Sequence, residues 1–355
     1  MGIVEIATAQ GFARALKGNL IDLKGTTRLS EAGTIKEVLD YLRSFPYYNK
    51  LLFSALDELP VDIGKIERLL NQSIIDDASR IERFLPDDIR CVVEKIIARY
   101  ELSNIKTILN IINSGQDQSL SQAFLLDMRE FKTIEGSKLL NVHSISDVIE
   151  ALEDTRYGPP LQNAYERYQR DNSLFTLKNA LDLFHFEELW DSINLMSPRK
   201  RNSILSVLGT EMDLRQIQWI LRFRINFKLP PHQTYNHIIH QGYLLDEELL
   251  NELSEAQEIE QFIKCLPRAY GRIVENSLND GLIDFTRLEV ASWHYIYEKA
   301  VEALYRRPIN PGIIFAYLSI KRVETDEIIS ILECKRYGMP KEDIRRYIIR
   351  DDTEF

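Results

Sequence analysis

The chain has 355 residues, and 45% of them are apolar, which is too many for a disordered protein and enough for several packed cores. It carries 54 acidic and 44 basic residues, and the resulting net charge of −10 argues against nucleic acid as the principal partner, because phosphate binding needs a basic face. The longest apolar run, "PGIIFAYLSI", is about half a membrane span, and the first residues lack the features of a signal peptide, so we expect a soluble, cytosolic protein.

Helical periodicity starts early in the chain. The stretch "IKEVLDYL" has apolar residues at i, i+3, i+4 and i+7, which is one stripe on a helix. Thr34 precedes this stretch and Glu37 follows three residues later, so the pair predicts a capping box. "SISDVIEAL" repeats the same device with Ser144 and Asp147.

Further helices are predicted for "NIKTILNII", "QIQWILRF" and "EIISIL". Glycine and proline fall between the helical stretches, for example in "YGPP", "RRPINPG" and "YGMP". Pro230 and Pro340 are 110 residues apart, and each is expected to open a helix, because the first helical turn tolerates proline. Alternating strand patterns are nearly absent, so the sequence predicts an all-α protein.

Two different landmarks each occur three times. "ELSNIKTIL" starts at Glu101, "DLRQIQWIL" at Asp213 and "ETDEIISIL" at Glu324, so the starts lie 112 and 111 residues apart. "TIKEVLDYLRSFPYY", "SISDVIEALEDTRYG" and "EIEQFIKCLPRAYG" start 110 and 114 residues apart, and each contains a tyrosine near its end. This shared period predicts three similar helical units of about 110 residues, at 10–110, 111–222 and 223–345.

The recurring acidic residues Glu101, Asp213 and Glu324 have two interpretations. We expect each of them just before or in the first turn of a helix, where a carboxylate accepts hydrogen bonds from free backbone amides. The alternative is that they mark three equivalent helix ends that point at a common central surface.

Sites for chemistry are sparse. No phosphate-binding loop of the GxxxxGK[ST] or GxGxxG type occurs, so no nucleotide or other cofactor is predicted. His232, His237 and His240 lie close in sequence, but they lack a partner motif and have no counterpart in the other repeats, so ordinary structural histidines are favoured over a metal site. Asp and Glu are abundant without forming a recognisable catalytic pair, so we predict neither metal ligands nor catalytic residues.

Two smaller features concern basic residues and cysteines. The basic cluster "SPRKRN" at 197–202 either contacts phosphate or an acidic partner, or is simply solvated. Cys91, Cys265 and Cys334 form no CxxC pair and stand in apolar helical contexts, so we predict buried free thiols in a reducing compartment.

The repeats resemble the C subunit of A/V-type ATPases, which is called the d subunit in the vacuolar enzyme. The similarity covers nearly the whole chain and is carried by order and spacing. The matching stretches are "ARYELSNIKTILNIINSG", "SISDVIEALEDTRYGPPLQNAYERY", "LGTEMDLRQIQWILRFRINF", "IIHQGYLLDEELLNEL" and "KRVETDEIISILECKRYGMPKEDIRRYII". The first helix keeps Phe12, Ala13 and Arg14 but lacks the family's Tyr/Asn opening, and Gln216 replaces the family's asparagine in the second repeat.

This resemblance implies a pseudo-threefold funnel and a subunit that is not itself an ATPase. Such a subunit links the central-stalk subunits of D and F type to the membrane rotor ring. It transmits torque for proton or sodium transport and lies peripherally on the cytoplasmic face of the membrane. Arg14, Arg222, Arg224 and Lys335 are the residues that the resemblance suggests as polar contacts of the coupling surface.

Two other classes of protein remain open at the sequence level. One is a helical-repeat scaffold that binds other protein partners, although such solenoids repeat at roughly 30–50 residues rather than at this period. The other is an all-α metalloenzyme, which would rest on the histidines alone.

Overall fold

A computed structural model describes residues 2–56, 61–116, 125–306 and 309–350. Helix accounts for 75% of the described residues, which confirms the predicted all-α class. The chain divides into two compact units. Unit 1 combines Met1–Ile63 with Ser197–Phe355, and unit 2 is Gly64–Met196.

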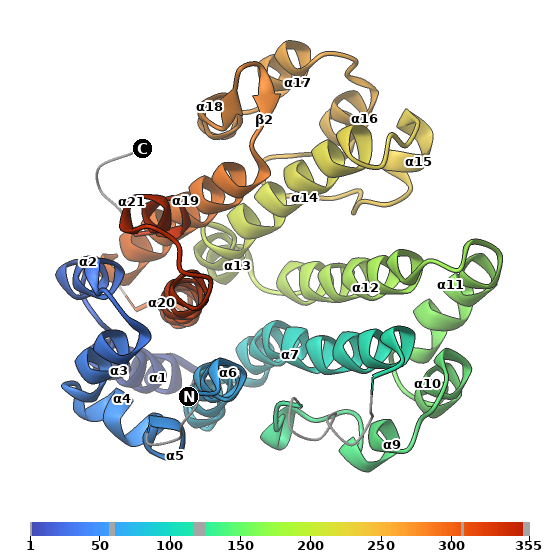
Figure 1. Ribbon diagram of the computed structural model, residues 1–355. Coiled ribbons are helices and arrows are strands. Elements are labelled where there is room, and N and C mark those ends of the chain that lie inside the picture. The colour runs from blue at the N-terminus through green and yellow to red at the C-terminus, as the bar shows by residue number, and fades with distance from the viewer. Residues whose placement is uncertain (1, 57–60, 117–124, 307–308, 351–355) are drawn as a thin grey trace. The chain divides into compact units, whose positions relative to one another are not determined.

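Unit 2 is built on two long helices that lie side by side, α7 and α12 (Figure 1). Their apolar faces enclose a core that the short helices of the unit complete, with Tyr157 and Leu161 fully buried in it. The elements in chain order are α6 (Ile63–Glu82), α7 (Asp87–Ser114), η2 (Arg129–Phe131), α9 (Gly136–Leu140), α10 (Ile145–Leu152), α11 (Gly158–Asp171) and α12 (Leu174–Asn194).

Unit 1 begins with helices from the N-terminal part of the chain. These are α1 (Gly2–Lys17), α2 (Leu23–Glu31), α3 (Ile35–Arg43), α4 (Pro46–Leu51) and α5 (Phe53–Leu56). Its remaining elements follow unit 2 in the chain. They are α13 (Pro198–Leu205), α14 (Leu208–Ile225), α15 (Pro231–Tyr235), α16 (Glu247–Glu255), α17 (Ile259–Cys265), α18 (Arg268–Asn276), β1 (Leu278–Asn279), β2 (Leu282–Ile283), α19 (Phe285–Tyr305), α20 (Gly312–Arg336), α21 (Lys341–Ile344) and η3 (Arg345–Tyr347).

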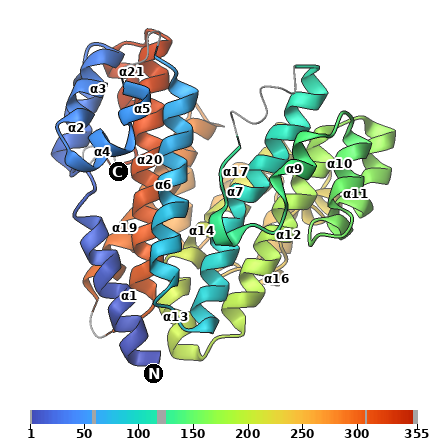
Figure 2. The same cartoon turned by 90° about the horizontal axis from the view of Figure 1, so that it is seen from below.

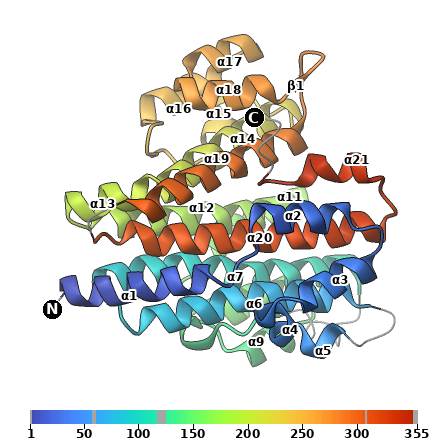
Figure 3. The same ribbon diagram turned by 90° about the vertical axis from the view of Figure 1, so that its left-hand side faces the viewer.

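Helix α20 is the centre of unit 1. The helices α1, α2, α3, α13 and α19 all pack against it, and Figures 2 and 3 show α1 and α19 running along it. Its residues from Gly312 to Ile320 are all buried, as expected for a helix that is apolar on every side. The first and the last parts of the sequence therefore share one core.

Both predicted helix starts are confirmed, but only one of the two predicted capping boxes is complete. The Thr34 hydroxyl accepts from the Glu37 amide at 3.2 Å, although the Glu37 carboxylate bonds to the Gly33 amide instead of closing the box. Ser144 and Asp147 form the complete capping box, so the short aspartate is sufficient there.

Pro230 and Pro340 each form the N-cap of a helix, as predicted, but α15 and α21 end after only one turn.

One strand pair was missed. β1 and β2 pair antiparallel with Leu278 opposite Ile283, and the turn between them is Asp280–Gly281 with positive φ at both residues. An Asp-Gly turn of this type is a strong hairpin signal in a sequence. The hairpin is short because only two residues on each side are free of the neighbouring helices α18 and α19.

Two expectations about environment can be compared with the structure. All three cysteines are free, but only Cys334 is buried, while Cys91 and Cys265 are half-buried. The prediction of three buried thiols was therefore wrong for two of them, because Cys91 lies near the start of α7 and Cys265 ends α17. Among the described residues, none of the helices is long and apolar enough to cross a membrane.

Candidate functional site: three carboxylate latches

A buried carboxylate in the middle of α7 holds two later segments of unit 2. Glu101 is only 3% exposed, and its Oε1 accepts the backbone amides of Thr133 at 2.7 Å and Ile134 at 3.0 Å. Its Oε2 accepts the hydroxyl of Tyr157 at 2.8 Å. The amides belong to the loop before α9, and Tyr157 is the residue before α11. One carboxylate thus fixes a loop and a tyrosine to the long helix.

The same arrangement occurs in α14 of unit 1. Asp213 is fully buried and accepts the backbone amides of Tyr243 and Leu244, both at 2.7 Å. It also accepts the hydroxyl of Tyr270 at 3.0 Å. The amides belong to the loop before α16, and Tyr270 lies in α18.

The third arrangement joins the two ends of the chain. Glu324 in α20 accepts the backbone amide of Ile21, just before α2, and the hydroxyl of Tyr48 in α4. The ammonium of Lys321 lies 3.7 Å from the Glu324 carboxylate, and both side chains are fully buried. The Lys321 ammonium also lies over the rings of Tyr47 and Tyr48, at 4.5 and 5.2 Å from their centroids.

We call each set of a carboxylate, loop amides and a tyrosine hydroxyl a latch. Burial and the adjacent carboxylate raise the pKa of each latch tyrosine, so each stays protonated and donates its hydrogen bond. The latches bring together the two landmarks of the sequence repeat, because the acidic residues start the first landmark and the tyrosines end the second.

The expected position of the three carboxylates was wrong. Glu101, Asp213 and Glu324 lie inside long helices, not in first turns, and they accept amides of another segment instead of their own helix. The helices begin well upstream of the repeated motif, where the three copies differ in sequence. A local window therefore places the helix start too late.

The latches follow a simple order along the chain. Glu101 holds 133–157, and Asp213 holds 243–270, so each long helix fixes the block of short helices that follows it. Glu324 instead holds residues 21–48, which come long before it in the chain.

A second polar position stands three residues after each latch carboxylate. Asn104 exchanges two hydrogen bonds of 2.9 Å with the backbone of Leu126, and Gln216 donates to the carbonyl of Gln241 at 2.9 Å. Gln216 thus makes one of the two bonds that asparagine makes in the first repeat. At the third such position stands Glu327, which accepts the amide of Arg350 at 2.6 Å.

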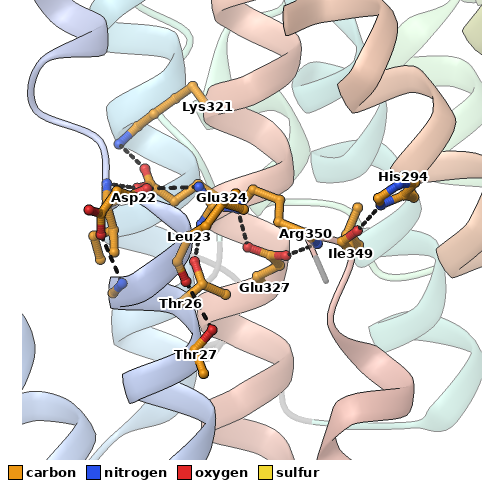
Figure 4. A network of polar contacts seen from close by, with 12 residues as sticks. Asp22, Leu23, Thr26, Thr27, His294, Lys321, Glu324, Glu327, Ile349 and Arg350 are labelled. Carbon is orange, nitrogen blue, oxygen red and sulfur yellow. Dashed lines mark hydrogen bonds and ion pairs between the residues drawn. The ribbon is translucent and has the colours of Figure 1, made fainter. Parts of the chain in front are cut away.

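Arg350 connects this third position to the N-terminal part of the chain (Figure 4). Its guanidinium donates to Glu327 at 2.5 Å, to the Ile21 carbonyl at 2.8 Å and to the Thr26 hydroxyl at 2.6 Å. Arg350 is 5% exposed, and Glu327 is 1% exposed. Next to it, a ring nitrogen of His294 lies 2.7 Å from the Ile349 carbonyl. Residues 349 and 350 are therefore bound to both α19 and α20.

Asp213 should give the protein a specific pH dependence. Burial raises its pKa from 3.8 to about 7, although the hydrogen bonds from Leu244, Tyr243 and Tyr270 oppose this shift. Because the folded state holds the proton more tightly, the contribution to stability is complete below the unfolded pKa and is lost as pH rises to about 7. The loss is at most about 4 kcal/mol at 1.36 kcal/mol for each pKa unit.

Urea denaturation at several pH values checks this prediction. The asparagine in Asp213→Asn does not titrate, so the stability of this variant should change less than that of the wild type between those pH values. Parallel curves for the two proteins would contradict the prediction.

A glycine follows the latch tyrosine in two repeats, as Gly158 and Gly271, and the two positions differ in the space available for a Cβ atom. A Cβ on Gly158 would lie 2.2 Å from the Glu153 carbonyl oxygen, whereas one on Gly271 would lie 3.2 Å from that of Ile263. We expect Gly158→Ala to lower the free energy of unfolding by about 1–3 kcal/mol through overpacking, and the matched variant Gly271→Ala to lower it less. Thermal denaturation of both variants checks this order, and equal effects would show that backbone clearance does not decide it.

The four cations suggested as interface residues lie in unit 1 but contact different places. The guanidinium of Arg14 donates to the Leu304 carbonyl at 3.3 Å. That of Arg222 lies 3.3 Å from Glu289, and that of Arg224 donates to the Leu229 carbonyl at 2.9 Å. The ammonium of Lys335 donates to the Ser30 carbonyl at 3.0 Å. Among the described residues these contacts bring no two of the four together.

Arg224 also lines a mostly apolar pocket of about 460 Å³ between the end of α14, α16, α17 and the hairpin. Arg224 and Lys335 occupy the same repeat position, eleven residues after their latch carboxylates. Both stand in the last turn of a helix, where a cation is favourable.

The histidines form no metal centre in the described part of the chain, where no three His, Cys, Asp or Glu side chains converge. His240 stacks on Tyr235 at 4.2 Å, and the ring of His237 lies 5.9 Å from that of Phe223. His237 and His240 therefore each pack against an aromatic ring.

The fold and the latches define a class of protein: an all-α protein in which three buried carboxylates on long helices each hold a loop and a tyrosine from another part of the chain. Comparison with known families is more specific. The model of the ATP synthase (C/AC39) subunit family matches residues 9–347, so the chain belongs to that family.

Individual relatives agree with this assignment. The chain is 25% identical to the C subunit of the A-type ATP synthase of Methanobrevibacter smithii, over 98% of this chain and 89% of that protein. It is 24% identical to the corresponding A-type ATP synthase protein of Methanosphaera stadtmanae, over 95% of this chain and 86% of the relative. The C subunit of Halorubrum lacusprofundi is also 24% identical, with 95% of both chains covered.

Proposed function

We propose that this chain is the non-catalytic rotor subunit of an A/V-type ATPase or ATP synthase. It links the central-stalk subunits of D and F type to the membrane rotor ring on the cytoplasmic side and transmits torque between them. The observation that carries this proposal is the set of three latches. A subunit that transmits torque must not deform under load. Buried, fully hydrogen-bonded polar groups make a packed structure rigid.

The repeat frame belongs to the same proposal. We infer three related units at 10–110, 111–222 and 223–345, arranged as a funnel around a pseudo-threefold axis. The equivalent latches support this frame, because each joins the same two landmarks of the repeat. The wide opening would receive the stalk.

Co-purification tests the proposed role. An affinity-tagged chain expressed in its native host and extracted with the membranes should bring down the stalk subunits and the rotor ring. Recovery of unrelated proteins without ATPase subunits would favour the helical-repeat scaffold instead.

The coupling surface gives a sharper prediction. We propose that Arg14, Arg222, Arg224 and Lys335 contribute to it, and we expect Arg222→Glu with Arg224→Glu to weaken stalk binding about tenfold, as rim charges affect association. Helicity and melting temperature should change little, because Arg222 is partly exposed and its pair with Glu289 is of the surface type.

Two controls separate the interface from internal effects. Arg345→Glu with Arg346→Glu makes the same charge change on exposed residues of η3 and should bind normally. Adding Glu289→Arg to the first pair restores the internal ion pair at position 222. If that addition restores binding, or if the first pair pumps ions as well as wild type, the arginines do not belong to the coupling surface.

A further inference from the structure

The basic cluster "SPRKRN" forms the start of α13, and the latches leave it unexplained. Pro198 occupies the first helical position, and no acidic residue stands in the first turn. Arg199 is exposed and Arg201 is half-buried, and no carboxylate pairs with either of them within the described ranges. Two cations at a helix start without counter-ions concentrate positive charge on this surface.

A further cation shares this end of unit 1. The start of α20 packs on α13, because a Cβ on Gly312 would lie 2.3 Å from the Ser203 carbonyl oxygen. Arg306 stands just before that start, at the end of α19. Figures 2 and 3 agree that α13 and the N-terminal end of α1 lie at the same end of the unit.

Apolar side chains are exposed at the same end. Ile3 and Val4, in the first turn of α1, are 73% and 71% exposed, and Tyr305 is 72% exposed. Single exposed apolar residues are common on protein surfaces. Here they lie at the same end of the unit as a group of cations, and this combination is typical of surfaces that lie at the headgroup level of a membrane.

The sign of the charge is what makes this end unusual. The whole chain has a net charge of −10, so an anionic surface repels it on average. At this end Glu302 pairs with Arg306 and Lys299, whereas Arg199 and Arg201 of α13 pair with no carboxylate in the part of the chain that the structure describes. An anionic surface would therefore bind the protein in one orientation only.

We propose that this end of unit 1 binds the anionic lipid headgroups of a membrane directly. We call it the basic end, and it consists of Ile3, Val4, Arg199, Lys200, Arg201, Tyr305 and Arg306. Lipid fits better than an acidic protein segment, because the cations come from two separate helices and exposed apolar side chains lie at the same end of the unit. A headgroup layer matches such distributed charge, and the acyl boundary accepts aliphatic side chains.

Vesicle co-sedimentation of the isolated chain tests the proposal. Wild type should bind vesicles that contain phosphatidylglycerol and should not bind vesicles of phosphatidylcholine alone. Each cation near an anionic membrane contributes about 1 kcal/mol, so Arg199→Gln with Arg201→Gln should lower the partition coefficient about 30-fold. Ile3→Ser with Val4→Ser should weaken binding and leave its salt dependence unchanged.

A matched control makes the result specific. Arg345→Gln with Arg346→Gln removes the same charge from η3, which follows α21, and Figure 3 places α21 at the opposite end of the unit from α13. This control should bind like wild type, and circular dichroism should show equal helicity in all variants.

Three results would overturn the proposal. They are failure of wild type to bind the anionic vesicles, equal loss in both arginine pairs, and release from vesicles by inorganic phosphate at matched ionic strength, which would indicate a small-anion site. The assay contains no other ATPase subunits, so a negative result would not affect the proposed role of this chain in the rotor.

Discussion

Replacing Glu324 with leucine should lower the free energy of unfolding by about 3–5 kcal/mol, the usual cost of leaving one partner of a buried ion pair alone. Within the residues that the structure describes, this variant leaves the fully buried ammonium of Lys321 with the ring faces of Tyr47 and Tyr48 as its only partners. The amide of Ile21 and the Tyr48 hydroxyl also lose their acceptor. Equilibrium urea denaturation measures the change.

A second substitution separates the charge from the packing. Lys321→Met removes the unpaired ammonium, so the double variant Lys321→Met with Glu324→Leu should be more stable than Glu324→Leu alone. Such a gain is expected when an apolar pair replaces a buried ion pair. If the double variant is no more stable than the single one, the buried ammonium is not the source of the loss.

Replacing Arg350 with methionine should have an effect of similar size that depends on pH. Burial already raises the pKa of Glu327, and Arg350 is the strongest influence that lowers it. Without Arg350 the folded pKa rises further above the unfolded value. A group with a raised folded pKa stabilises the protein at low pH, so the deficit should be about 3–5 kcal/mol near neutral pH and should shrink as the solution becomes more acidic.

Denaturation at several pH values and hydrogen exchange together check this result. The amides around Thr26 should exchange faster in Arg350→Met, because the guanidinium no longer ties the Ile21 carbonyl and the Thr26 hydroxyl to α20. The exposed variant Arg346→Met serves as control and should change neither measurement. A deficit that is the same at every pH would show that Glu327 does not carry the lost energy.

The sequence predicts the helices well, because they depend on local spacing. The capping pair of Ser144 and Asp147 lies within four residues, and the structure has it as predicted. The equivalence of Glu101, Asp213 and Glu324 also follows from spacing alone.

The latches could not be predicted, because they join residues far apart in the chain. Tyr48 and Glu324 are separated by 276 residues, and no local pattern records that they meet. Arg350 was missed for a different reason. Arg350 binds Glu327, whereas the residues that correspond to Glu327 in the other two repeats, Asn104 and Gln216, bind backbone groups directly. The repeat pattern therefore gives no signal for an arginine partner.

The third latch also affects the order in which the chain can fold. The amide of Ile21 lies 303 residues before its acceptor, and the Ile21 carbonyl lies 329 residues before Arg350. At roughly 5–20 residues per second of synthesis, the first block waits about 15–60 s for α20 to leave the ribosome. Throughout that time the apolar faces of α2 and α3 lack α20, the helix that covers them. We therefore expect a chaperone to bind these N-terminal helices during synthesis.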